Sequence, residues 1–495
     1  MLRRITQILI LVVQILLLAS CQSIMATIDA PVATAGKPST TPIQSTANSS
    51  PLPNPGIPPI GSPTPAHFTQ PTSTPLNPAV YHNSFADAFS ADGQELAFTS
   101  SVVGLIHGDL SDGIRSYIYQ TQSGAIQRIS PEDKSTFGNA RQMKAISLSA
   151  DGRYLLYAER DTNSIEPAFD HFDHIYLRDL QTGQDESLDL TLLEKQLGGA
   201  RVTPKSVSPD GCYLALSVYE DRTSIYLLEL STYKLVPVSV NPKNTTSESR
   251  EPTFSPDGDF LAFVSTAGNL VPGGDTCLQV NPCADIFVYQ ITTGMIERIS
   301  AQIQFTMGEP YPSLTISNKA RWLAWTEVER SEYASRMVVR LYDRSTGNAE
   351  LICAGAGQAC TAGSPSISND GRWLAFDSWH LGDSVGYHPS ESNAQVYLLD
   401  LQTRKLTLVS ATSNGVPGDG NSGIVFLQQE GHSDDVRISG DGRYVAFSSQ
   451  AANLLPKGVE KSQCFAPNFG GAYPCYDLFI YDNQTGVTTW ISKPG

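Results

Sequence analysis

The sequence has little positive charge: 33 Lys and Arg residues stand against 49 Asp and Glu residues, which gives a formal net charge of −16. It contains no cluster of basic residues, and phosphate groups repel an acidic surface. We therefore exclude nucleic acid as a partner.

Other signals are also missing. After the N-terminal segment the sequence shows no helical periodicity of apolar residues, which disfavours an α-helical domain. We recognise no nucleophile elbow of an α/β-hydrolase and no H-E-x-x-H metal motif. No pair of cysteines has the C-x-x-C spacing of a zinc cluster. We therefore expect that the protein is not an enzyme and holds no metal cluster of this kind.

Residues 1–20 read as a targeting segment, with Arg3 and Arg4 before the apolar run Ile5–Leu18. Gln7 and Gln14 interrupt this run, which is short for a stable membrane span. The stretch Leu18-Ala19-Ser20-Cys21 resembles the bacterial lipobox, which implies that Cys21 is lipidated and becomes the mature N-terminus. An ordinary secretory signal or a membrane anchor is the alternative.

Residues 21–80 are rich in Pro, Ser and Thr and nearly uncharged. Such a composition favours extended chain and lacks apolar residues for a core. We expect a disordered tether that holds the folded part away from a membrane.

A short motif recurs from residue 81 onward. Ser368-Asn369-Asp370-Gly371 predicts a tight turn, because Asp bonds local backbone and Gly accepts positive φ. Leu374 and Phe376 then face one side of a strand that should be buried on both faces. The motif occurs seven times, once in degenerate form, at Phe89–Gly93, Leu148–Gly152, Val207–Gly211, Phe254–Gly258, Ile316–Ala320, Ile367–Gly371 and Ile438–Gly442.

A second motif alternates with the first and also occurs seven times. Ile175–Gly183, Asp285–Gly294 and Asp477–Gly486 each predict a strand, a Thr-Gly-type turn and a final strand. Together the two motifs give four antiparallel strands per unit at a period of roughly 50–60 residues, which is typical of a β-propeller.

The motif pair resembles the WD40-like (PD40) repeats of TolB-type propellers, most closely where Ala267–Gly273 leads into Asp285–Val288. This resemblance implies an all-β, seven-bladed propeller over residues 81–495, rather than six or eight blades. The α/β domain that precedes the propeller in TolB is missing, and the fifth unit lacks Asp-Gly.

Strand direction places the Asp-Gly and Thr-Gly turns on one face of the disc and the remaining connections on the other. We call the second face the long-loop face, because nearly all variation in loop length falls there. Binding residues tend to lie on loops held by a rigid scaffold, so this face is the expected binding site. Its long connections are Ser101–Ser116, Glu159–Asp173, Ser265–Ala284, Ser378–Ala394, Ala411–Asp435 and Ser449–Tyr476.

Six of the eight cysteines form near-neighbour pairs on the long-loop face. In an oxidising compartment these pairs predict three local disulfides, Cys277–Cys283, Cys353–Cys360 and Cys464–Cys475. Cys212 is left over near the short-turn face, and we expect a free thiol there.

Two clusters carry ligand-type side chains. Asp170-His171-Phe172-Asp173-His174 could hold a transition metal, but extended chain would scatter these groups, so solvated loop residues are the preferred interpretation. The set Asp419, Asn421, Asp434 and Asp435 is rich in oxygen and is a calcium candidate without the spacing of a known calcium loop. We expect no other cofactor.

Residues that lead into the innermost strands should ring the mouth of the central channel. Their mixed charge suits a polar ligand or a peptide, and it equally suits a solvated rim; they are Asp87, Lys144, Lys205, Arg250, Glu251, Glu309, Tyr311, Asp434 and Asp435.

These observations together predict a lipid-anchored, monomeric propeller of the bacterial cell envelope, outside the cytoplasm. It would bind a protein or peptide through the long-loop face and contact the membrane through lipid on Cys21. Two alternatives stay open: a carbohydrate-binding or surface-sensing module, and an envelope enzyme that acts on polysaccharide through loop carboxylates.

Overall fold

The computed structural model describes residues 64–65, 67–68, 83–107, 114–129, 142–160, 174–220, 222–240, 248–267, 270–272, 283–300, 303–304, 313–330, 335–352, 361–379, 393–423, 435–466 and 471–494. Within them, seven antiparallel sheets follow one another along the chain, each built on four consecutive main strands. These sheets are the blades.

The first three blades use twelve strands in chain order. They are β3 (Ser84–Phe89), β4 (Glu95–Ser100), β5 (Arg115–Gln120), β6 (Ile126–Arg128); β7 (Gln142–Leu148), β8 (Tyr154–Arg160), β9 (His174–Asp179), β10 (Gln184–Ser187); and β11 (Arg201–Val207), β12 (Tyr213–Tyr219), β13 (Thr223–Glu229), β14 (Lys234–Pro237). The helix α2 (Leu190–Gln196) precedes the third blade, and the Asp189 side chain caps its N-terminus.

The other four blades repeat the plan. They are β15 (Ser249–Phe254), β16 (Phe260–Ser265), β17 (Cys283–Gln290), β18 (Ile296–Arg298); β20 (Leu314–Ile316), β21 (Trp322–Arg330), β22 (Ser335–Asp343), β23 (Asn348–Ile352); β24 (Thr361–Ile367), β25 (Trp373–Trp379), β26 (Gln395–Asp400), β27 (Leu406–Leu408); and β28 (Val436–Ile438), β29 (Tyr444–Ser449), β32 (Asp477–Asp482), β33 (Val487–Trp490). Short additions are β19 (Ile303–Gln304) on β17 and the hairpin β30 (Gln463–Ala466) with β31 (Gly471–Pro474).

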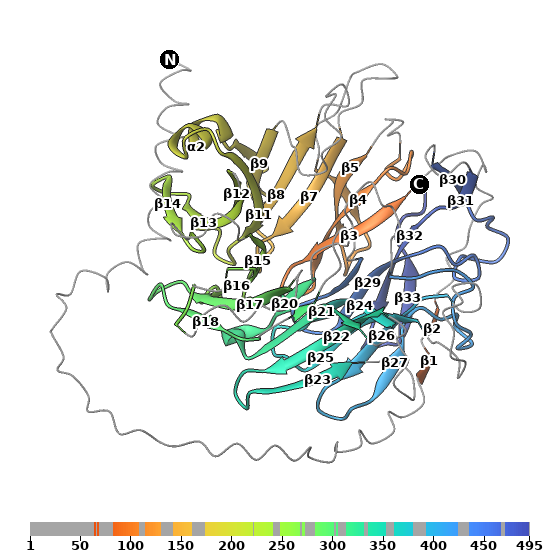
Figure 1. Ribbon diagram of the computed structural model, residues 1–495. Helices are drawn as coiled ribbons and strands as arrows, with labels where there is room; N and C mark the ends of the chain where they lie inside the picture. The colour runs from red at the N-terminus through yellow and green to blue at the C-terminus, as the bar shows by residue number, and fades with distance from the viewer. Residues whose placement is uncertain are drawn as a thin grey trace, which may run out of the picture. The chain divides into compact units, whose positions relative to one another are not determined.

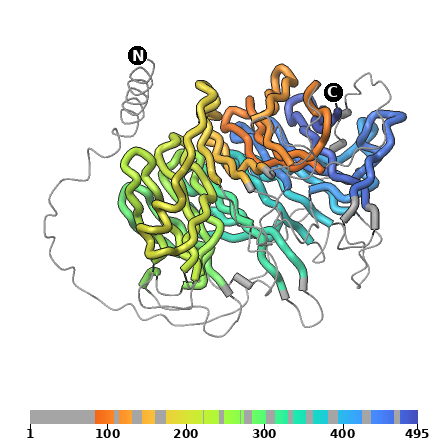
Figure 2. Tube along the Cα trace, turned by 90° about the horizontal axis from the view of Figure 1, so that it is seen from above, coloured from red at the N-terminus to blue at the C-terminus, as the bar shows by residue number. Residues whose placement is uncertain are grey.

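The blades form a closed ring. The first strands of successive blades contact one another in the cycle β3, β7, β11, β15, β20, β24, β28 and back to β3. In Figures 1 and 2 the blue seventh blade lies beside the orange first blade. The prediction of a seven-bladed, four-stranded propeller is confirmed.

Two short strands precede the blades. β1 (Thr64–Pro65) pairs in parallel with β27, and β2 (His67–Phe68) pairs in parallel with β33. Each adds a further strand at the outer edge of a blade. They lie within the span 21–80 that the sequence assigned to a tether, and the compact unit that contains the blades begins at Gly61.

The core lies between neighbouring blades, because both faces of the central strands are apolar. On β25 the side chains of Leu374, Ala375 and Phe376 are fully buried, as the sequence predicted. Stacked aromatic pairs join the second and third strands of five blades, at Phe98–Tyr117, Tyr157–Tyr176, Phe263–Phe287, Phe376–Tyr397 and Phe447–Phe479. Cross-strand aromatic pairs of this kind stabilise the register.

The fifth blade forms its first hairpin without Asp-Gly. A short 3₁₀ turn, Asn318–Ala320, takes its place, with φ of 58° at Lys319 and 49° at Ala320. The Trp322 N–H still donates to the Ser317 hydroxyl at 2.9 Å.

In the part of the chain that the structure describes, no helix is long and apolar enough to cross a membrane.

Candidate functional site

The recurrent Ser-x-Asp-Gly turn builds the short-turn face. In the sixth blade the Ser368 hydroxyl donates to Asp370 Oδ1 at 2.6 Å and accepts from the Trp373 N–H at 2.9 Å. Asp370 Oδ1 also accepts from the Arg372 N–H at 2.9 Å. The Ser and Asp side chains therefore satisfy the turn's own backbone. These carboxylates therefore stabilise their own turns.

An Arg–Asp pair stands on the same face in several blades. The Arg153 guanidinium lies 2.8 Å from Asp179 Oδ2 and over the ring of Tyr154. Burial would raise the pKa of Asp179, but Arg153 and the N–H groups of Thr182 and Gln181 outweigh it and hold this pKa below its ordinary value. The same arrangement recurs at Arg372–Asp400 and Arg443–Asp482. These charges are paired with each other, so this face is not an open anion or cation site.

The central channel is lined by β-bulges on the innermost strands. Register shifts occur between Ala86 and Ala88, Ala145 and Ser147, Pro204 and Ser206, Arg250 and Thr253, and Gly363 and Ser366. Three of the residues predicted for the channel mouth, Asp87, Lys205 and Glu251, fall within these bulges. A bulge re-aims a side chain and often lies beside a binding site.

Two bulges hold a non-glycine residue at positive φ. Glu251 in the fourth blade has φ of 54°, and Ser364 at the matching bulge of the sixth has φ of 45°. Left-handed backbone at such residues costs on the order of 1 kcal/mol and collects at functional sites. Within the described residues, the bulges make the channel wall one of two candidate sites.

Two carboxyl groups meet where the first and seventh blades join. The Ala86 N–H donates to Asp435 Oδ1 at 3.1 Å, and the Thr99 hydroxyl donates to Asp87 Oδ2 at 2.7 Å. Burial raises the pKa of Asp87 to about 7, although Thr99, Lys144 and Arg437 oppose the rise. Burial also raises the pKa of Asp435 to about 7, and the nearby Asp87 adds to this rise. Such a pair can hold or move a proton near neutral pH.

On the long-loop face, cross-links brace the connections of the sixth and seventh blades. The Asn453 N–H donates to Asp419 Oδ1 and the Asp419 N–H donates to Asn453 Oδ1, both at 3.1 Å. Asn421 Oδ1 accepts from the Ala394 N–H at 3.0 Å, while the Asn421 carbonyl accepts from the Gln450 N–H at 2.8 Å. We call residues 411–423, 449–464 and 473–476 the braced loop surface.

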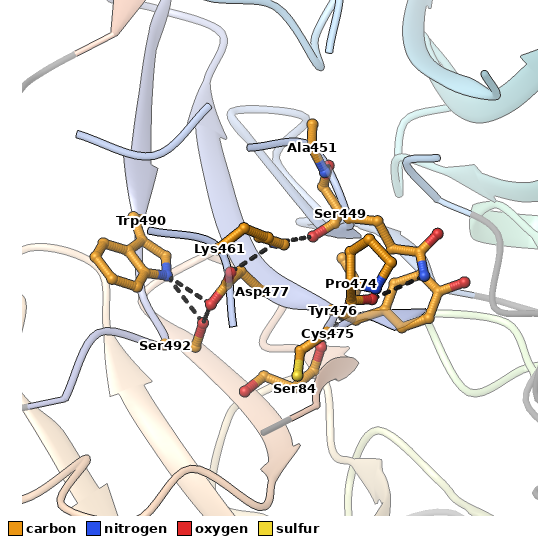
Figure 3. Close-up of polar contacts among 12 residues, drawn as sticks. Ser84, Ser449, Ala451, Lys461, Pro474, Cys475, Tyr476, Asp477, Trp490 and Ser492 are labelled. Carbon is orange, nitrogen blue, oxygen red and sulfur yellow. Dashed lines mark hydrogen bonds and ion pairs between the residues drawn. The ribbon is translucent and has the colours of Figure 1, made fainter. Parts of the chain in front are cut away.

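A buried ion pair anchors this surface (Figure 3). Lys461 Nζ lies 2.7 Å from Asp477 Oδ2 and donates to the Ser449 carbonyl at 2.9 Å. Asp477 Oδ1 accepts from Trp490 Nε1 at 3.1 Å and from the Ser492 hydroxyl at 3.0 Å. Both charged side chains are almost fully buried, at 6% and 11% exposure. The loop is therefore held by a charge pair that the sequence did not suggest.

The predicted disulfide Cys464–Cys475 is present and ties β30 to the residue after β31. The other two predicted pairs, Cys277–Cys283 and Cys353–Cys360, involve side chains outside the described residues. The expectation of a free thiol at Cys212 is wrong: Cys212 is disulfide-bonded, and its partner lies outside the described residues. Near-neighbour spacing identified the local pair but could not show a bond to a distant cysteine.

The structure describes Asp87, Lys144, Lys205, Arg250, Glu251 and Asp435 among the residues predicted for the channel mouth. Glu309, Tyr311 and Asp434 lie outside the described residues, as do all members of the Asp170–His174 cluster except His174. Asp87 and Asp435 come together with Lys144, whereas Arg250 pairs with Glu248 at 3.1 Å.

The described residues contain no group of three or more His, Cys, Asp or Glu side chains placed to hold a metal ion. In the calcium candidate, oxygens of Asp419 and Asn421 accept backbone N–H groups. These contacts give the two side chains a bracing role.

No family model and no curated protein matches this chain. Among solved structures, a prolyl endopeptidase is similar at a TM-score of 0.50 and 13% identity, over 83% of this chain and 49% of that one. This chain thus spans about half the length of that enzyme. TolB from Acinetobacter baumannii is similar over 80% of both chains, with a TM-score of 0.39 and 14% identity. An oligogalacturonate lyase in complex with manganese has a TM-score of 0.44 and 13% identity, over 79% of this chain and 94% of that one.

At 13% identity the likeness to the prolyl endopeptidase shows a shared fold and no more. The prediction that the protein is not an enzyme is wrong as it stood, because enzymes such as the prolyl endopeptidase share this fold. It also overlooked one G-x-S-x-G spacing, Gly382-Asp383-Ser384-Val385-Gly386, which lies outside the described residues. Neither the fold nor the motif search excludes catalysis.

Proposed function

We propose that this propeller is a binding protein of the bacterial cell envelope, which holds a protein or peptide on the braced loop surface. One observation carries the proposal: reciprocal hydrogen bonds join the connections of two blades, and a buried ion pair and a disulfide hold the loop of the seventh blade. Loops that are already ordered lose little conformational entropy when a partner docks, which favours affinity.

The composition of the surface supports a protein partner. Val416 is 54% exposed, which is unusual for a large apolar residue, and Asp419, Lys457 and Glu460 around the same loops are exposed. Protein interfaces likewise combine apolar and charged side chains.

Crosslinking followed by pull-down from intact envelopes tests this function. Val416→Arg should reduce the yield of a specific crosslinked partner at least several-fold, because it places a charge at the apolar centre. Met295→Arg is the matched control, since Met295 is 67% exposed on a Thr-Gly turn of the opposite face. Equal capture by both variants and the unaltered protein would contradict binding through this surface.

We also propose that lipid on Cys21 anchors the protein outside the cytoplasm. The lipobox-like sequence supports the anchor, and the Cys464–Cys475 disulfide supports an oxidising compartment. Cys21→Ser should move the protein out of the membrane fraction or leave its precursor unprocessed. Retention of the processed, lipid-modified variant in the membrane fraction would show that the anchor is elsewhere.

A second candidate is an enzyme that acts on polysaccharide, and the Asp87–Asp435 carboxyl pair favours it. Two carboxyls with pKa values of about 7 could supply a general acid and a general base. Release of soluble sugar from purified envelope polysaccharide by the unaltered protein, abolished in Asp87→Asn, would favour this candidate. No release by the unaltered protein would remove it.

A further inference from the structure

The ring closes where the first and seventh blades meet, and the chain that leads into the first blade also supplies β2, which pairs with β33 at the outer edge of the seventh blade. Every strand of the first blade lies between Ser84 and Arg128, and every main strand of the seventh lies between Val436 and Trp490. At the channel, hydrogen bonds connect these two blades. We call this contact, formed by Asn83–Asp87 with Asp435–Arg437, Ser448 and Tyr476, the closure interface.

At its channel side, backbone groups of β3 meet polar side chains of the seventh blade. The Ser448 hydroxyl donates to the Ser84 carbonyl at 2.7 Å, and Arg437 Nε donates to the Asp87 carbonyl at 2.8 Å. The Ala86 N–H donates to Asp435 Oδ1 at 3.1 Å. Arg437 Nε thus donates to a backbone carbonyl and not to a carboxylate.

The two carboxyls of the interface come from opposite blades. Asp435 is 1% exposed, and its Oδ2 accepts no hydrogen bond within the described residues. Asp87 is partly exposed on the bulge of β3. Asp87 and Asp435 repel each other when both are ionised, and protonation of either carboxyl removes this repulsion.

The charged groups around the pair come from three other positions. Lys144 on β7 and Arg437 on β28 stabilise the ionised form of Asp87. Asp377 on β25 lies near Val436, because a Cβ on Gly423 would touch both, at 2.8 Å and 2.9 Å. β4 and β29 contribute the hydroxyls of Thr99 and Ser448. Two cations therefore oppose three carboxyls here.

We propose that the closure interface is proton-dependent: a proton held by Asp87 and Asp435 joins the channel sides of the first and seventh blades, and its loss loosens them. The beginning of β3 stays attached to the seventh blade, because Asn83 contacts the hairpin β30–β31 and the Tyr476 N–H through an amide that does not titrate. Loosening would then widen the channel wall without unfolding the ring.

The direction in which pH changes the stability of the closure interface follows from the pKa values of Asp87 and Asp435. Both carboxyls have a pKa of about 7 in the folded protein, against an ordinary value of 3.8. The folded state holds protons that the unfolded state has already released, so the stability of the interface is full below about pH 4. It decreases as the pH rises toward 7 and changes little above that.

Hydrogen exchange of the mature full-length protein, read by mass spectrometry and corrected for intrinsic rates, tests the proposal. The peptide over Ser84–Phe89 should lose protection several-fold between pH 6 and pH 8.5. Asp87→Asn and Asp435→Asn each keep an oxygen that can accept the Thr99 hydroxyl or the Ala86 N–H, and the double variant should lose this pH dependence. Asp259→Asn, at an exposed carboxyl of the fourth blade, is the control and should behave as the unaltered protein.

Carbon-13 NMR of labelled aspartate in the unaltered protein measures the titration itself, whether or not the double variant folds. Two carboxyls with midpoints above pH 6 would support the proposal. Midpoints of all aspartates below pH 5, or pH-dependent exchange that survives in a folded double variant, would overturn it.

Discussion

The indole of Trp322, in the fifth blade, lies directly against Gly371 of the sixth. A Cβ added to Gly371 would be 2.2 Å from Trp322 Cδ1, closer than real atoms approach. Gly371 also has φ of +71°, which disfavours any side chain. Trp373 contacts Gly442 in the same way. At these two Asp-Gly turns, glycine therefore allows the positive φ of the turn and also leaves room for an indole from the neighbouring blade.

Gly371→Ala should therefore destabilise the protein through two effects. Positive φ costs about 1 kcal/mol, and displacement of Trp322 adds about 1–3 kcal/mol. Gly104→Ala is the matched control, because Gly104 has φ of +74° with nothing within 4 Å of an added Cβ. Urea unfolding midpoints measure the difference. Equal losses in the two variants would mean that the aromatic contact contributes nothing.

The buried pair Lys461–Asp477 gives a prediction of rescue (Figure 3). Lys461→Met should destabilise the protein by about 3 kcal/mol, because it leaves a buried carboxylate without its cation. Adding Asp477→Asn should restore much of the loss, since an amide oxygen can still accept from Trp490 and Ser492. Thermal unfolding of the single and double variants checks this. A double variant that is less stable than Lys461→Met would contradict it.

Periodic features were predictable from the sequence, and contacts between distant positions were not. The seven copies of each turn motif, some of them degenerate, predict the blade number, because each turn is determined by residues next to it. Cys464–Cys475 was predictable for the same reason, at a separation of 11 residues. The pairing of Lys461 with Asp477 depends on how a long loop folds back, which no local pattern encodes.

In the candidate site, too, local features were predictable from the sequence and contacts between distant residues were not. Asp87 and Asp435 were both predicted near the channel, because each leads into an innermost strand. Their meeting depends on ring closure between residues more than three hundred positions apart, as the contact from Ala86 to Asp435 shows. The bulges that aim Asp87, Lys205 and Glu251 have no clear sequence signal, since non-glycine residues occupy them.

The Arg–Asp pairs of the short-turn face predict a pH dependence at low pH. The pKa of Asp179 is below its ordinary value, so its stabilising effect is present above about pH 4 and is lost as pH falls through the lowered pKa. Asp179→Asn should be less stable than the unaltered protein by up to about 1 kcal/mol at pH 7, allowing for solvent screening. In urea unfolding, the difference should become smaller as the pH falls below about 4. Asp259→Asn should show no such change, and a constant difference at all pH values would contradict the assignment.

The last prediction concerns the disulfide hairpin that meets the start of the first blade. Asn83 Oδ1 accepts from the Tyr476 N–H at 3.0 Å, and Asn83 Nδ2 donates to the Tyr473 hydroxyl at 3.1 Å. Cys464→Ala with Cys475→Ala opens a loop of 11 residues, so the loss of global stability should be at most about 2–3 kcal/mol. The larger effect should be local.

In that double cysteine variant, limited proteolysis should cut within residues 463–474 at least several-fold faster, while strand circular dichroism stays unchanged. Asn83→Ala should increase the same cleavage with the disulfide intact, because it removes two side-chain contacts that help to hold the hairpin on the first blade. Asn453→Ala serves as the control, since it breaks the separate link to Asp419 on the other side of the braced loop surface. Equal cleavage of the hairpin in all three variants and the unaltered protein would show that Asn83 and the disulfide do not hold it.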